Sequence, residues 1–175
     1  PGPLREVLVN ELVAALSAST GDRKLVVLIG KPGSGRTQLA AAACSMAEDQ
    51  FQNIHWIEAS EPLDIPAQIV ALGKETLQGR GWPEKLPEQV EATLTAWNQS
   101  PERLVVFNHF PDPSLFNEWA KKLKKVSILV TTSARQWSSK FTLIHLDKTE
   151  REESVAILRD HSPRFEKTPA DKLDL

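Results

Sequence analysis

The segment Gly30–Thr37 (GKPGSGRT) places three glycines and a final threonine between two very different stretches of chain. Before it, Lys24–Ile29 (KLVVLI) is an apolar run typical of a strand buried on both faces. After it, Thr37–Glu48 is rich in alanine, the best helix former. This order matches the P-loop template G-x-x-x-x-G-K-[ST], except that Arg36 stands at the lysine position. The segment therefore predicts a strand, a phosphate-binding turn and a helix.

Further strand-like segments follow along the chain, at Ile54–Ala59, Leu104–Phe107, Val126–Thr132 and Phe141–Leu146. Helix signals fill most of the intervals: an amphipathic stretch Leu4–Leu16, the single face of Val90, Leu94 and Trp97, the cap and first turn Asp112-Pro113, and the capping box Thr149-x-x-Glu152. Strands separated by helices indicate parallel βαβ units. We therefore expect a three-layer α/β P-loop NTPase fold, with a five-stranded, mainly parallel sheet and helices on both faces.

Length and composition exclude several other classes of protein. A chain of 175 residues that is 41% hydrophobic and 25% charged suits one soluble globular domain and is not typical of a disordered chain. The net charge of −2 excludes a broad basic surface for nucleic acid. No apolar stretch approaches the roughly 20 residues of a membrane helix. Cys44 is the only cysteine, which excludes an intramolecular disulfide and fits a cytoplasmic location.

The glycine-rich segment has a clear chemistry. Glycines allow consecutive backbone N–H groups to form a concave nest for phosphate oxygens, and the following helix adds its positive N-terminus. Thr37 would offer its hydroxyl to Mg²⁺. Arg36 keeps the positive charge of a lysine but is wider and planar, so phosphate binding can survive while hydrolysis suffers. Lys31 is a second cation in the loop, either exposed or acting across a dimer.

Two other strand ends carry polar residues. Asn108 and His109 follow the run LVVF, where P-loop enzymes need an acid for the magnesium shell. Asn108 brings no charge, His109 either lines the pocket or merely follows the strand, and Asp112 is either a substitute acid or a helix cap. After the fourth strand, the segment Thr131–Arg135 offers hydroxyls and an arginine, which are either γ-phosphate sensors or surface residues.

The ordered set GKPGSGRTQLA, IHWIEAS, LVVFNHFPDP, ILVTTSARQW and HLDKTEREESVAIL resembles the NB-ARC nucleotide-binding domain of STAND-class P-loop NTPases, most closely the microbial type that carries tetratricopeptide repeats. The similarity spans about Arg5 to Arg159. The resemblance implies a signalling switch that ADP holds closed and ATP opens for oligomerisation. It implies that phosphates and Mg²⁺ are held by Gly30, Gly33, Gly35, Arg36, Thr37 and Gln38, with Lys31 and Ser34 in the same loop. It also implies that Arg5 lies against the adenine, that Asn108 and His109 occupy the magnesium-acid positions, and that Thr132 and Ser133 occupy the sensor positions.

Three departures from the family pattern fall on catalytic positions: Arg36 for lysine, Asn108 for aspartate and Ser133 for arginine. They predict ATP or ADP binding with a weakened magnesium site and at most weak hydrolysis, since removing one electrostatic stabiliser commonly lowers a rate about a hundred- to a thousand-fold. Both a naturally degenerate NTPase and a chain mutated to trap nucleotide fit them. We expect residues 1–161 to be a nucleotide-binding domain excised from a larger protein, and 162–175 to be a polar tail or the start of the next segment.

Two alternatives remain open. The chain is either a pseudo-NTPase interaction scaffold, in which Arg36 fills the phosphate site itself, or a competent ATPase that uses Lys31 in a dimer. The expected partners are a nucleotide and, through missing domains, other proteins or further copies. Neither nucleic acid nor membrane is expected, because a solvated helix end explains the one dense basic cluster, Lys121, Lys122, Lys124 and Lys125.

Overall fold

The computed structural model describes residues 2–17, 21–77 and 81–146. The predicted capping box at Thr149–Glu152, the end of the proposed domain at residue 161 and the tail 162–175 lie outside the described residues. Among the described helices, none has the length and apolar character needed to cross a membrane.

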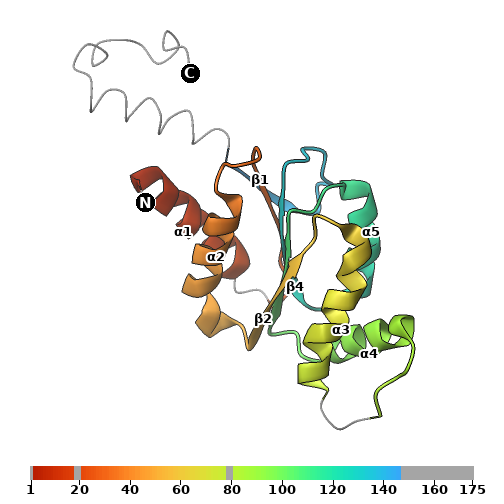
Figure 1. The fold of residues 1–175 in the computed structure, drawn as a ribbon. Helices are drawn as coiled ribbons and strands as arrows, with labels where there is room; N and C mark the ends of the chain where they lie inside the picture. Colours follow the sequence, from red (N-terminus) through yellow and green to blue (C-terminus); the bar gives the residue numbers. More distant parts are fainter. Residues whose placement is uncertain (1, 18–20, 78–80, 147–175) are drawn as a thin grey trace, which may run out of the picture.

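One parallel sheet forms the centre of the fold (Figure 1). Its strands are β1 (Leu25–Ile29), β2 (Asn53–Glu58), β3 (Arg103–Asn108), β4 (Ser127–Thr132) and β5 (Thr142–His145). They lie in the order β2-β3-β4-β1-β5, and every neighbouring pair is parallel. The sheet confirms the predicted five strands, each within a residue or two of its expected bounds.

Helices cover both faces of this sheet, which gives the expected three layers (Figure 1). The α-helices are α1 (Pro3–Ser17), α2 (Arg36–Met46), α3 (Ile65–Thr76), α4 (Leu86–Asn98) and α5 (Pro113–Lys122), and two 3₁₀ turns are η1 (Glu48–Gln50) and η2 (Pro62–Asp64). In Figure 1, α1 and α2 lie on one side of the sheet, and α3, α4 and α5 lie on the other.

Two hydrophobic cores follow from the alternation of side chains along the strands. On β1, Val27 and Ile29 point into the core beneath α3, α4 and α5, whereas Val26 and Leu28 point into the core beneath α1 and α2. All four side chains are at most 1% exposed. A strand buried on both faces reads as a continuous apolar run, which is why β1 was recognisable in the sequence.

Helix α5 begins as its sequence predicts. Asp112 is the N-cap and accepts a hydrogen bond from the Ser114 backbone N–H at 2.9 Å, and Pro113 opens the helix. Phe116 on its inner face is fully buried and makes an edge contact with Phe107 of β3, with ring centroids 5.2 Å apart. These contacts fix the helix that follows β3, and with it the carboxyl edge of the sheet.

Candidate functional site

The loop that joins β1 to α2 adopts the conformation that its glycines permit. Gly33 and Gly35 have φ values of 78° and 86°, in the left-handed region that favours glycine. At Gly30 a Cβ atom would lie 2.7 Å from Ser34 Oγ, so a side chain there would force its neighbours to move. Gly35 is the N-cap of α2 and brings no side-chain cap, so the first-turn amides of this helix are left without one. The loop thus combines a backbone turn of nest type with an uncapped helix N-terminus, which is an anion-binding arrangement.

Two side chains of the loop are buried. Ser34 is 5% exposed, and its Oγ has no hydrogen-bond partner among the described residues. Arg36 is 7% exposed, and its Nη1 donates to the Gly30 carbonyl oxygen at 2.7 Å. The guanidinium therefore turns back onto the start of the loop. Lys31 and Gln38, the other predicted phosphate ligands with long side chains, are exposed.

Arg5 on α1 reaches the same loop. Its Nη2 donates to the Ser34 carbonyl oxygen at 3.4 Å. A Cβ atom at Gly35 would lie only 2.9 Å from Arg5 Nη1. Arg5, which the resemblance places against the adenine, thus contacts the loop Gly30–Thr37, about thirty residues further along the chain.

The ends of β3 and β4 bring hydroxyl, amide and imidazole groups to the start of α2. Thr37 Oγ1 lies 3.1 Å from Asn108 Oδ1 and 3.1 Å from His109 Nε2. Asn108 Oδ1 also accepts a hydrogen bond from Thr131 Oγ1 at 2.8 Å. Asn108 is 2% exposed, so this amide is a buried junction between the loop and the sheet.

Glu58, at the end of β2, completes this network, and the sequence analysis missed it. Asn108 Nδ2 donates to Glu58 Oε2 at 2.9 Å, and His109 Nδ1 lies 3.0 Å from Glu58 Oε1. Burial alone would raise the pKa of the Glu58 carboxyl, but hydrogen bonds from Asn108 and His109 outweigh it and hold the pKa below its usual value. No local motif marks Glu58, because it joins the site only through the pairing of β2 with β3.

His109 has a backbone conformation that is uncommon for a residue with a side chain, although histidine adopts it more often than most. Its φ is 60°, and it is the only residue other than glycine with a positive φ in the described part of the chain. Its backbone N–H donates to Thr131 Oγ1 at 2.9 Å. Backbone strain of this kind persists only where the surroundings enforce it, and it is frequent at functional sites.

Among the predicted sensor residues, Thr132 is buried and has a structural role, whereas Ser133 and Arg135 are exposed. Thr132 is 1% exposed; its Oγ1 donates to the Phe110 carbonyl oxygen at 2.7 Å and accepts from the Ala134 N–H at 3.0 Å. This hydroxyl is therefore engaged in shaping the turn after β4. Ser133 and Arg135 are exposed at the same edge of the sheet.

The oxygen donors near Thr37 do not fit a resident magnesium ion. Asn108 supplies an amide where a carboxylate is expected, and its Oδ1 already lies against the hydroxyls of Thr37 and Thr131. The Glu58 carboxylate is turned toward Asn108 and His109. Within the described residues, no three His, Cys, Asp or Glu side chains come together as a metal site.

Solved structures similar to the chain share its fold. Cdc6p from Pyrobaculum aerophilum superposes with a TM-score of 0.61 at 14% identity, over 90% of this chain and 49% of that one. DnaA from Aquifex aeolicus with AMPPCP bound gives a TM-score of 0.49 at 12% identity, over 91% of this chain and 53% of that one. A DNA replication initiation factor gives 0.48 at 13% identity, over 91% and 52%. The chain thus spans about half the length of these structures.

At such identities the likeness shows the fold alone, and it confirms the predicted α/β fold of P-loop NTPase type. No family model and no curated protein matches the sequence.

Proposed function

We propose that this chain is a nucleotide-binding module that holds ATP or ADP at the loop Gly30–Thr37 and hydrolyses it weakly or not at all. The observation that carries the proposal is the loop itself. Gly33 and Gly35 take left-handed conformations, the N-terminus of α2 has no side-chain cap, and Ser34 Oγ is buried without a partner among the described residues. Each of these features offers a hydrogen-bond donor where a phosphate oxygen would lie.

Weak hydrolysis follows from the residues at the ends of the strands. The position that needs a carboxylate holds Asn108, which is neutral, buried and bonded at both ends of its amide. Arg36 directs Nη1 to the Gly30 carbonyl oxygen. A loss of electrostatic stabilisation at either position would lower the rate about a hundred- to a thousand-fold, and losses within one catalytic unit do not add.

We further propose that the module serves as the switch of a STAND-type signalling protein. The support is the ordered set of sequence motifs together with the contact of Arg5 with the loop. In such a protein the bound nucleotide would control self-association and contacts with protein partners through further domains.

A thermal-shift titration with ATP and with ADP tests nucleotide binding. A ligand at about a hundred times its dissociation constant stabilises the folded state by roughly 2.7 kcal/mol, which raises the Tm of a chain of this size by about 5 to 10 °C. Gly33 allows a matched pair of variants, because a Cβ at this position meets no atom within 4 Å, and Asn and Asp share the same tolerance for its left-handed φ of 78°. We expect Gly33→Asn to keep most of the shift and Gly33→Asp, which has the same shape, to lose it through charge repulsion with phosphate.

The second candidate function is a scaffold that binds no nucleotide, and the hydrogen bond from Arg36 to the Gly30 carbonyl oxygen favours it. If the guanidinium closes the loop, the unmodified chain shows no shift with any nucleotide, whereas Arg36→Lys gains one. A shift in the unmodified chain that Gly33→Asp abolishes would exclude this scaffold.

A further inference from the structure

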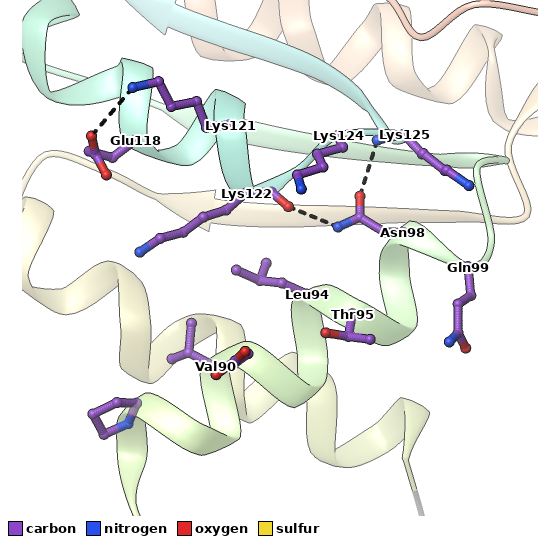
Figure 2. A pocket seen from close by; sticks show the side chains of 12 residues that line it. Val90, Leu94, Thr95, Asn98, Gln99, Glu118, Lys121, Lys122, Lys124 and Lys125 are labelled. Carbon is purple, nitrogen blue, oxygen red and sulfur yellow. Dashed lines mark hydrogen bonds and ion pairs between the residues drawn. The ribbon is translucent and has the colours of Figure 1, made fainter.

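A groove with four lysines lies between α4 and the end of α5 (Figure 2). Its volume is about 590 Å³, and the residues that define it here are Val90, Leu94, Lys121, Lys122, Lys124 and Lys125. We call it the lysine groove. We propose that it docks an acidic amphipathic helix of a partner protein, which carries carboxylates beside a face of aliphatic side chains.

The two sides of the lysine groove are held in a fixed relation. The Asn98 side chain, near the end of α4, donates from Nδ2 to the Lys122 carbonyl oxygen at 2.8 Å and accepts from the Lys125 backbone N–H at 3.1 Å (Figure 2). Both hydrogen bonds of this amide thus tie α4 to the turn between α5 and β4. A partner would meet a pre-formed surface, which lowers the entropic cost of binding.

The positive charge of the groove is displayed toward solvent. Lys124 and Lys125 have exposed side chains and form no ion pair with any carboxylate in the described part of the chain. Lys121 pairs with Glu118 only at 4.0 Å, with both side chains more than 70% exposed, a geometry that contributes little to stability. Lys122 lies over the Trp119 ring at 5.2 Å. Since the whole chain carries a net charge of −2, these lysines are a local excess of positive charge.

The floor of the groove is apolar, which distinguishes a peptide from a nucleic acid as its occupant. Val90 and Leu94, which are only 8% and 4% exposed, lie one turn apart on α4 at the bottom of the groove (Figure 2), and the aliphatic stems of the lysines extend this apolar surface. Glu91 and Glu118 also line the groove, so its four lysines leave a net charge of +2 for an acidic partner. An acidic amphipathic segment matches both the lysines and the floor, as in helix-in-groove recognition.

The lysine groove is separate from the nucleotide loop. Lys125 comes just before β4, which begins at Ser127, so it lies at the amino-terminal edge of the parallel sheet. The loop Gly30–Thr37 follows β1 and lies at the opposite, carboxyl edge. The partner segment and a nucleotide can therefore bind at the same time. A negative result at one of the two sites does not bear on the other.

Fluorescence anisotropy with a labelled synthetic peptide tests the docking proposal. The probe is a peptide of glutamates and leucines at helical spacing, titrated at about 0.1 M salt, where exposed charges still interact at short range. We expect saturable binding that Lys122→Glu/Lys124→Glu weakens at least about tenfold. A control for charge reversal outside the groove is Lys74→Glu, which reverses one exposed lysine on α3 and should change binding less than about twofold.

Changes in the peptide test the floor without disturbing the protein. Replacing the leucines by serines, or the glutamates by glutamines, should each weaken binding at least about tenfold. The proposal is overturned if no saturation occurs up to about 1 mM peptide, or if the double lysine variant, shown to be folded by circular dichroism, binds as well as Lys74→Glu. Tighter binding of oligothymidine than of the peptide at these lysines would overturn it in favour of a nucleic-acid surface.

Discussion

Asn108 donates a hydrogen bond from Nδ2 to Glu58 Oε2 over 2.9 Å, joining the ends of β3 and β2. An aspartate at this position could not donate that hydrogen bond at neutral pH, and its carboxylate would face the Glu58 carboxylate directly. The neutral residue at position 108 is therefore matched to an acid on the neighbouring strand. Asn108, which stands where the family pattern has an aspartate, is thus part of a consistent hydrogen-bond network.

Replacing Asn108 by aspartate should therefore destabilise the protein. We expect Asn108→Asp to lower the free energy of unfolding by about 1–3 kcal/mol at neutral pH, because a buried carboxylate loses a partner and gains a like charge. Urea denaturation measures this change. The matched control is Glu58→Gln/Asn108→Asp, which restores a donor opposite the new carboxylate and should recover most of the loss. Equal losses in the single and double variants would contradict the pairing.

Much of the fold was predictable because the strands carry their signal locally. The continuous apolar runs of β1, β3 and β4 arise from burial on both faces, and they marked these strands to within a residue or two. The start of α5 was equally clear, since Asp112 and Pro113 have direct capping roles. Helix α3 was not predicted as a separate helix, although Asp64 and Pro66 stand at its start; Gly73 inside the helix weakens its pattern.

The candidate site was predictable only in part. The loop Gly30–Thr37 and the strand end at Asn108 have local motifs, and the structure brings Thr37 and Asn108 within 3.1 Å of each other. Glu58 has none, since its role depends on β2 lying next to β3, some fifty residues away along the chain. The direction of the Arg36 side chain likewise depends on tertiary packing and not on the motif.

The positive φ of His109 gives a second prediction. The left-handed conformation is unfavourable by about 1–2 kcal/mol of free energy for a residue with a Cβ, but not for glycine. We expect His109→Gly to be more stable than His109→Ala by about 1 kcal/mol in thermal or urea unfolding, because both variants lose the imidazole contacts and only one relieves the backbone. An alanine variant as stable as the glycine variant would show that φ at this position is not strained.

A third prediction concerns pH and His55. This buried imidazole stacks on Trp97 with centroids 4.3 Å apart, and its Nε2 lies 2.9 Å from Arg103 Nη1. Burial, and secondarily the charge of Arg103, lower the pKa of His55 from 6.5 to about 4. The unfolded chain therefore binds the proton first. The contribution of His55 is fully present above about pH 6.5 and is lost as the pH falls toward 4.

Urea unfolding between about pH 7 and pH 4.5 measures this loss. His55→Gln keeps a hydrogen-bond acceptor for Arg103 but does not titrate, so its stability should fall less over this range. Parallel pH profiles for the unmodified chain and His55→Gln would contradict the assignment.

The contact between α3 and α4 gives a fourth prediction. Alanine is normally a better helix residue than glycine by about 1 kcal/mol. At Gly73, however, a Cβ atom would lie 2.1 Å from Thr93 Oγ1 and 2.6 Å from Thr93 Cγ2. We expect Gly73→Ala to destabilise the protein by about 1–3 kcal/mol in urea unfolding, because the two helices must separate. In a Thr93→Ala background, which lacks both of these atoms, the same change should be clearly less harmful; an unchanged penalty would place its cause elsewhere.

The most direct test of the proposed function is calorimetric titration of the purified chain with ATP and with ADP, each with Mg²⁺ and with a chelator. Because Asn108 engages its amide oxygen with Thr37 and Thr131 and leaves no carboxylate for the metal, binding should depend little on Mg²⁺. We predict binding of one nucleotide per chain, with dissociation constants that differ less than about threefold between the two conditions. No heat with either nucleotide, or affinity that falls tenfold or more when Mg²⁺ is removed, would contradict this account of the site.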